Sequence, residues 1–199
     1  MTPSILPAAD AGALYLHVRV LLGMIVGLGL THLLRHVARI VDHPRQTRVY
    51  WVHLVWVLFV FVYLLHFWWW EFRLSAMVPW TFAIYLFVAV YALLLYLLCA
   101  FILPDSLDGY AGYREYFYSR RRWIFGTLAV VFVVDFADTW IKGSAYLESF
   151  GPEYPIRTGA YVIACLIAIA TARPWFHAAF AIAALVYQVS WIARQYELI

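Results

Sequence analysis

Charged residues are scarce in this chain. Only 13% of its 199 residues are charged, against about 25% in soluble domains, and 66% are hydrophobic. The mean hydropathy is +0.80. A water-soluble globule of this size cannot bury so much apolar surface, so the lipid bilayer must be the solvent for most of the chain. This composition excludes a soluble enzyme, a disordered chain and a nucleic-acid-binding domain.

Cysteine and the common catalytic motifs are also rare or missing. The two cysteines, Cys99 and Cys165, lie inside apolar stretches, and no CxxC is present. The chain contains no GxSxG, HExxH, P-loop or glycine-rich dinucleotide fingerprint. These absences argue against thiol redox chemistry and favour a protein that is not an enzyme.

Six apolar stretches are long enough to cross a hydrocarbon core of about 30 Å as helices. They cover about 14–34, 49–70, 78–103, 123–141, 155–172 and 174–193. Backbone groups in lipid must be paired within their own segment, and the alternating pattern of a β-barrel is absent. The sequence predicts an all-α polytopic integral membrane protein, with residues 1–199 forming a single six-helix transmembrane domain.

The basic residues are divided unequally between the two sides of the membrane. Nine follow the first, third and fifth spans: Arg35, Arg39, Arg45, Arg48, Arg114, Arg120, Arg121, Arg122 and Arg173. Four lie on the other side: Arg73, Lys142, Arg157 and Arg194. The positive-inside rule places the nine in the cytoplasm and both termini outside, which is the periplasm if the membrane is a bacterial inner membrane.

Between the third and fourth spans, helical spacing predicts a short amphipathic helix over about 105–119. It precedes the basic cluster Arg120, Arg121 and Arg122, which we expect at the lipid interface of the cytoplasmic leaflet. The bilayer is therefore the predicted partner of this segment. A net charge of +3 is too small and dispersed for a nucleic-acid partner.

Small residues indicate where helices pack closely. Gly23 and Gly27 form a GxxxG in the first span, and Ala181 and Ala184 share a stripe with Gln188 in the sixth. We expect these stripes to face the bundle. The same motif would also serve a homo-oligomer or a partner within a membrane complex.

Polar residues of separate spans fall at similar depth on the outer side. They are Arg19, His66, Asp135, Asp138 and Gln188. Charged groups inside spans are expensive and mark candidate functional sites. We predict an ion pair between Arg19 and Asp135, a second pair between Asp138 and Lys142, and a polar cavity open to the outside.

Three functional hypotheses follow from this layer. The first is transport or permeation of a proton, ion or small polar ligand. The inner halves of the second and fourth spans, over 55–61 and 126–134, lack ionisable residues, so a simple open channel is disfavoured. The second is a structural or accessory membrane subunit in which the ion pair orders the helices. The third is a redox protein that binds haem or a metal.

Histidines provide the candidates for that third hypothesis. His32 and His36 are four residues apart, and His53 faces them from the second span, so the three are weak candidate ligands of a divalent metal. Haem between the first two spans fits the depths of their histidines, but thirteen residues between His53 and His66 place them on different helix faces. We therefore predict no cofactor.

Overall fold

The computed structural model describes residues 8–43, 48–76 and 80–196, and all regular elements in these ranges are helical. The helices are α1 (Ala8–Asp42), α2 (Trp51–Trp70), η1 (Glu71–Ala76), α3 (Phe82–Ile102), α4 (Tyr113–Ile141), α5 (Ser144–Glu148), α6 (Glu153–Ala170) and α7 (Pro174–Tyr196). Six of them are long and apolar enough to cross a membrane, which confirms the predicted six-helix bundle. Arg45 and the predicted start of the third span at residue 78 lie outside the described residues.

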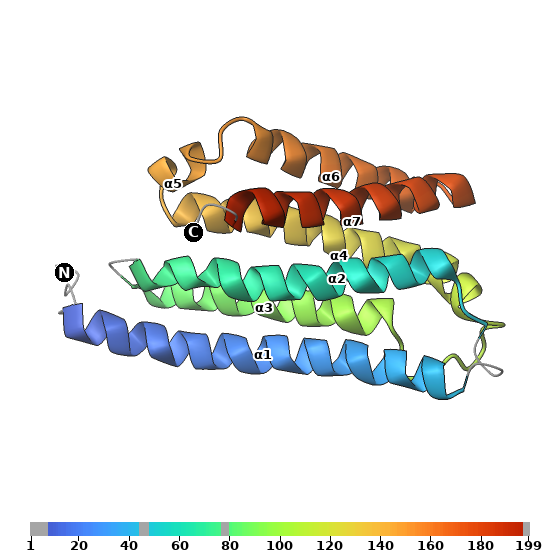
Figure 1. Cartoon of the computed structure of the whole chain (residues 1–199). Coiled ribbons are helices and arrows are strands. Elements are labelled where there is room, and N and C mark those ends of the chain that lie inside the picture. Colours follow the sequence, from blue (N-terminus) through green and yellow to red (C-terminus); the bar gives the residue numbers. More distant parts are fainter. Residues whose placement is uncertain (1–7, 44–47, 77–79, 197–199) are drawn as a thin grey trace.

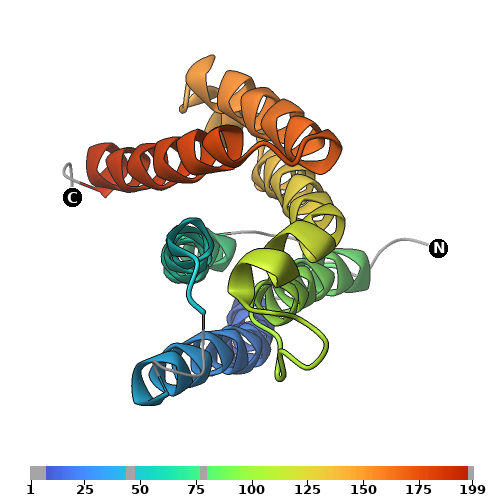
Figure 2. The same cartoon turned by 90° about the vertical axis from the view of Figure 1, so that its right-hand side faces the viewer.

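The long helices lie side by side in two groups (Figures 1 and 2). The first group is α1, α2 and α3, and the second is α4, α6 and α7. α3 packs against α4, and α2 packs against both α4 and α7, so α2 joins the two groups. α1 contacts α2, α3 and η1 but is separated from α4 among the described residues.

The two ends of the bundle differ in what they carry. α1 begins and α7 ends at the end that also holds η1 and α5 (Figure 1). We call it the η1 end. The opposite end carries the links α1–α2, α3–α4 and α6–α7, where the arginines assigned above to the cytoplasm gather, and we call it the arginine end.

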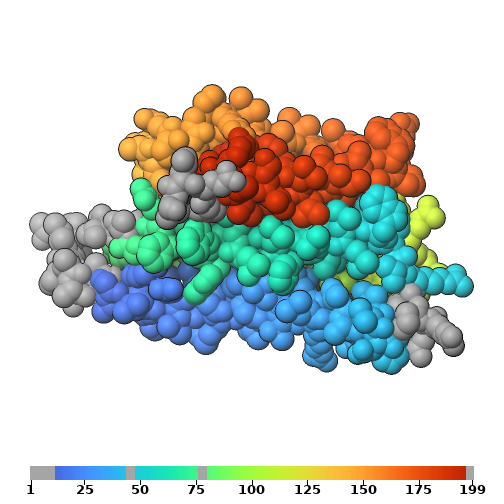
Figure 3. Space-filling view, viewed as in Figure 1, coloured from blue at the N-terminus to red at the C-terminus, as the bar shows by residue number. Residues whose placement is uncertain are grey.

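Large apolar side chains are exposed on every span. One example from each is Leu28, Leu58, Leu93, Val133, Ile163 and Val186, all between 48% and 61% exposed. Figure 3 shows α1, α2 and α7 beside one another across a single continuous face. Apolar side chains exposed at mid-helix are stable only against acyl chains, so the chain is an integral membrane protein.

The predicted interfacial helix over 105–119 is wrong. Residues 103–112 are not helical, and α4 begins at Tyr113 and continues unbroken to Ile141. Gly112, the last residue before α4, lies close to Arg48, and a Cβ added to Gly112 would be 2.7 Å from the Cβ of Arg48. The Tyr113 amide also donates a hydrogen bond to the Arg48 carbonyl. The cluster Arg120–Arg122 is therefore part of α4 itself.

The glycine motif of α1 faces the bundle only in part. A Cβ on Gly23 would meet the Trp68 ring at 2.9 Å, whereas a Cβ on Gly27 would meet nothing within 4 Å. Gly29 instead approaches Cys99 and Leu64. The stripe of α7 is fully inward, as predicted: Ala181, Ala184 and Gln188 are buried.

Candidate functional site

Asp135 is the centre of a buried hydrogen-bond network near the η1 end. One carboxylate oxygen accepts from the Tyr91 hydroxyl at 2.9 Å. The other accepts from the Tyr154 hydroxyl at 2.8 Å and from Nη2 of Arg157 at 3.2 Å. The hydroxyls of Tyr91 and Tyr63 are 3.1 Å apart. The network therefore joins α2, α3, α4 and α6 through one carboxylate.

A second cluster lies one turn farther along α4. Nζ of Lys142 donates to Oδ2 of Asp138 at 2.5 Å, as predicted, and to Oε1 of Glu71 at 2.9 Å. All three side chains are at most 3% exposed. Burial lowers the pKa of Lys142, but the two carboxylates outweigh it and hold the pKa above its usual value. Lys142 therefore keeps its charge through the physiological range.

Together these two clusters form what we call the charged layer, which consists of Glu71, Asp135, Asp138, Lys142 and Arg157. Three carboxylates face two cations in it, so the fully ionised layer carries one surplus negative charge. An unbalanced charge in a low-dielectric interior is unfavourable. Binding a proton or a cation would neutralise the surplus.

The predicted ion pair between Arg19 and Asp135 is wrong. Arg157 is the partner of Asp135, and α1, which carries Arg19, makes no contact with α4 among the described residues. Arg19 and Gly23 do share a face, as their spacing requires, and both meet Trp68 of α2, with the guanidinium 5.7 Å from the ring centroid. The face that Arg19 shares with Gly23 was predicted from the sequence, but the neighbour of Arg19 was not.

Two contributors to the layer were not singled out from the sequence. Arg157 lies less than one turn inside the fifth span, and Glu71 directly follows the second span, where both could be taken for interfacial charges. One signal was available for Arg157. Arg157 lies inside the apolar stretch over 155–172, where a charged side chain is expected to face the bundle. It does so and pairs with Asp135, whereas Glu153, one turn earlier, binds Arg194 at the rim.

His66 and Gln188 lie beside the layer. Nε2 of Gln188 is 3.1 Å from Nδ1 of His66, which joins α7 to α2 as the shared depth indicated. Trp70 lies between them and the network, because the centroid of its ring is 5.3 Å from that of His66 and 6.5 Å from that of Tyr154. His66 and Gln188 thus border the site.

Several buried polar atoms of the site have no hydrogen-bond partner within the described part of the chain. They are Oε2 of Glu71, Nε and Nη1 of Arg157, and Oε1 of Gln188. A buried polar atom without a partner costs roughly 1–3 kcal/mol. These atoms therefore favour a site that holds water, an ion or a ligand over one closed by protein contacts alone.

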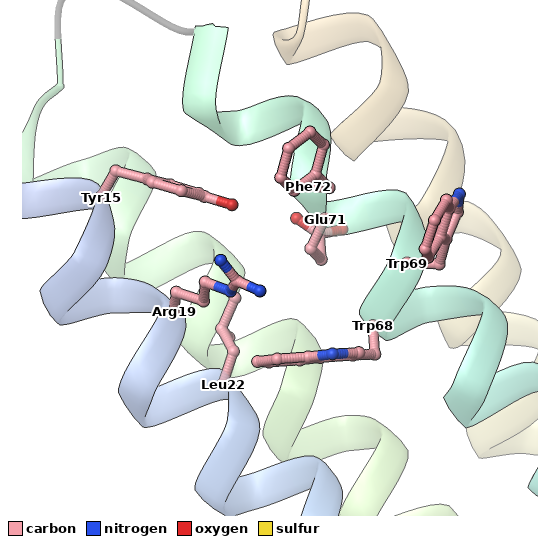
Figure 4. Close-up of a pocket in the computed structure, with 7 residues that line it drawn as sticks. All are labelled: Tyr15, Arg19, Leu22, Trp68, Trp69, Glu71 and Phe72. Carbon is pink, nitrogen blue, oxygen red and sulfur yellow. The ribbon is translucent and has the colours of Figure 1, made fainter. Parts of the chain in front are cut away.

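A pocket of about 240 Å³ opens beside the layer at the η1 end. It is lined by Tyr15, Arg19, Leu22, Trp68, Trp69, Glu71 and Phe72 (Figure 4). Glu71 belongs to both the pocket and the charged layer, because its Oε1 atom binds Lys142 while its carboxylate also lines the pocket. The pocket therefore gives the layer access toward the η1 end.

Toward the arginine end, the core between α2 and α4 is apolar and aromatic. We call this region the apolar band, and its members are Trp56, Phe59, Phe125, Leu128 and Phe132. All five are at most 1% exposed. Neither helix has an ionisable residue over 54–62 or 123–134. In these two segments, no ionisable side chain continues from the charged layer toward the arginine end.

The histidine candidates lie at the arginine end. His32, His36 and Asp105 have ligand atoms within 4.8 Å of one another. His53 is not part of this group, because its Nε2 atom is 2.5 Å from the Ile102 carbonyl. A backbone carbonyl likewise engages one ring nitrogen of His32 and one of His36, at 2.7 Å each. These bonds fix the ends of α1 and α3.

The predicted lipid-contacting arginines lie near the start of α4. Arg120 and Arg122 are exposed, and Arg121 donates to the Tyr118 carbonyl at 2.7 Å. Their position at the end of a span suits contact with headgroups, although they belong to a transmembrane helix.

Comparisons with protein families, curated proteins and solved structures find no match to this chain.

Proposed function

We propose that this multi-pass membrane protein transports a proton or small cation that enters from the η1 end and binds in the charged layer. The observation that carries the proposal is the charge balance, since three buried carboxylates face two buried cations. The titratable and charged groups around Asp135 are Tyr63 and Tyr91 on α2 and α3, Tyr154 and Arg157 on α6, and His66.

The same geometry suggests how release would have to occur. The apolar band separates the layer from the arginine end, so a bound proton or cation cannot leave that way without rearrangement of the helices. An alternating-access cycle fits this arrangement better than an open pore does.

The test is proton flux into liposomes containing the purified protein, followed with an internal pH-sensitive dye. Asp135→Asn removes the carboxylate that joins four helices, and we expect at least a tenfold loss of flux. Asp108→Asn is the matched control, because Asp108 is exposed in the link between α3 and α4. Wild-type flux equal to that of empty liposomes, for protons and for Na⁺ and K⁺ alike, contradicts the proposal.

We also propose that the η1 end faces the outside, which is the periplasm in a bacterial inner membrane. The arginines of the described links lie at the opposite end, as the positive-inside rule requires of a cytoplasmic face. Ser149→Cys and Ser106→Cys place exposed thiols at the two ends, while the native cysteines are buried. Only the first should react with a membrane-impermeant maleimide in intact cells.

A structural or accessory subunit is the second candidate. It is favoured by the number of bonds in the layer, since Asp135 accepts three and Lys142 donates two. In that case the exchange of Asp135→Arg with Arg157→Asp should restore stability lost in either single variant, and the wild-type protein should show no flux.

A further inference from the structure

The pocket at the η1 end has two chemically different walls (Figure 4). Tyr15, Arg19 and Leu22 are spaced by four and three residues, so one face of α1 supplies all three. The other wall comes from the end of α2 and the start of η1, which supply two tryptophans, Glu71 and Phe72. The Tyr15 hydroxyl and the Arg19 guanidinium point toward the Glu71 carboxylate across the pocket.

The opposite charges in this pocket do not pair with each other. The described residues include no ion pair between Arg19 and Glu71. Arg19 is exposed and lies over Trp68, and Glu71 uses Oε1 for Lys142 while Oε2 has no partner. Glu71 is only 3% exposed, so its second oxygen is a buried acceptor beside the pocket. The pocket thus offers a cationic donor and an anionic acceptor at once.

This pair of groups selects a zwitterion. A guanidinium binds phosphate oxygens through two parallel N–H donors. A carboxylate oxygen accepts from an ammonium, and the faces of Trp68, Phe72 and Tyr15 add cation–π attraction. A wholly anionic ligand is repelled by Glu71 and a wholly cationic one by Arg19. A quaternary ammonium has no N–H to donate to Oε2, so a primary amine fits better than choline.

The surroundings of the pocket indicate a lipid headgroup. Its volume of about 240 Å³ is below the roughly 300–1,000 Å³ of pockets that hold drug-sized ligands. The neighbouring side chains Leu16, Val20, Trp69 and Phe72 are between 58% and 61% exposed, and exposed apolar side chains on a span contact acyl chains. Three consecutive tryptophans, Trp68–Trp70, mark the headgroup level.

We propose that this pocket binds the ethanolamine-phosphate zwitterion, with the phosphate on Arg19 and the amine on Glu71. The two sources of this group are phosphatidylethanolamine and soluble phosphoethanolamine. This assignment does not depend on the proposed transport function, although the pocket shares Glu71 with the charged layer and opens beside it at the η1 end.

Native mass spectrometry of the detergent-solubilised protein tests this assignment. Phosphatidylethanolamine, phosphatidylcholine and phosphatidylglycerol with identical acyl chains are added in turn, and the retained fraction is measured. We expect about a tenfold preference for phosphatidylethanolamine, and about a tenfold loss of that preference in Arg19→Gln. Equal retention of all three lipids, or wild-type preference in Arg19→Gln, overturns the proposal.

Further variants separate binding from folding. Arg73→Gln is the matched control, because Arg73 lies in η1 over Tyr146, at 4.8 Å, and does not line the pocket. It should keep the preference. Tyr15→Phe should weaken it less than Arg19→Gln does. Thermal unfolding without added lipid is measured for each variant, and an Arg19→Gln protein that unfolds like wild type but still selects phosphatidylethanolamine counts against the assignment.

Two more arms identify the source and separate this proposal from the transport proposal. Displacement of the lipid by millimolar phosphoethanolamine shows that the headgroup alone suffices, and retention of the lipid under the same conditions shows that the acyl chains contribute. Asp135→Asn, which is outside the pocket, should lose flux and keep the lipid preference. Loss of preference in Asp135→Asn but not in Arg19→Gln would contradict the pocket assignment.

Discussion

The half of the bundle near the η1 end and the half near the arginine end are built from the same helices but stabilised by different forces. In the half near the η1 end, Asp135 and Asp138 of α4 form hydrogen bonds and ion pairs with neighbouring side chains. In the other half, the buried rings of Phe125 and Phe132 pack against their neighbours. In lipid, apolar side chains gain little from leaving the solvent, so packing and polar contacts must drive association. The comparison suggests that specificity resides in the first half and shape complementarity in the second.

The largest expected effect is the removal of the single lysine. Lys142→Met leaves the Glu71 and Asp138 carboxylates buried without their cation. We expect a loss of about 3–5 kcal/mol in the free energy of unfolding, measured by denaturant titration in mild detergent. Adding Glu71→Gln and Asp138→Asn to Lys142→Met should recover much of it. A loss below about 1 kcal/mol would show that the charged layer does not stabilise this half.

A smaller effect is expected in the apolar band. Phe132 is fully buried, and its ring stacks on Tyr161 with centroids 4.3 Å apart. Phe132→Ala leaves a cavity, which costs about 3–5 kcal/mol in a soluble core, but lipid supplies equivalent contacts to the unpacked helices. We therefore expect about 2 kcal/mol in the same titration. The exposed Val133→Ala is the control, and equal losses in both would contradict the described packing.

Alkaline pH should weaken the charged layer through Lys142. The pKa of Lys142 is higher in the folded protein than in the unfolded chain, where it is about 10.4. The stabilisation by Lys142 is therefore complete below this pH and declines as the pH rises above it. At pH 11 the expected loss is about 1 kcal/mol, because the unfolded chain releases a proton that the folded protein keeps.

Lys142→Arg provides the comparison for this pH effect, since a guanidinium keeps its charge throughout. The difference in unfolding free energy between wild type and Lys142→Arg is measured from pH 8 to pH 11. If this difference stays constant, the pKa of Lys142 is not higher in the folded protein than in the unfolded chain.

The smallest effects concern the glycines of α1. Gly23→Ala forces the far end of Trp68 to move, because the new Cβ would lie 2.9 Å from its ring, and we expect a loss of about 1 kcal/mol or less. Gly27→Ala meets open space and should gain a few tenths of a kcal/mol from helix propensity. Thermal unfolding of both variants checks this difference. A marked loss in Gly27→Ala would reveal a contact with a second copy.

Much of the fold follows from sequence because membrane insertion is a local property. The number of spans and their helical state depend on length, hydropathy and backbone pairing, and both agree with the structure. Helix boundaries are predicted less reliably. A helix that contains arginines, such as the segment around Arg121, can lie along the membrane surface or extend a span into water, and α4 does not separate the two.

The candidate site was only partly predictable for a different reason. The pair of Asp138 with Lys142 follows from helical spacing on one helix, and the stripe containing Gln188 follows from phase. The partner of Asp135 does not follow, since Arg19 and Arg157 both lie near the right depth. Sequence also gives no sign that Glu71 turns inward at η1 and reaches Lys142.

The amino-acid sequence alone determined that this is a six-span membrane protein with acids and bases buried toward one side. It could do so because position along a helix records depth in the bilayer. Only the tertiary structure decided which charges meet, since partner choice depends on how each helix is rotated and which helices are neighbours. α6 packs on α4 and brings Arg157 to Asp135, while α1 lies against α2 and leaves Arg19 at a pocket beside Glu71.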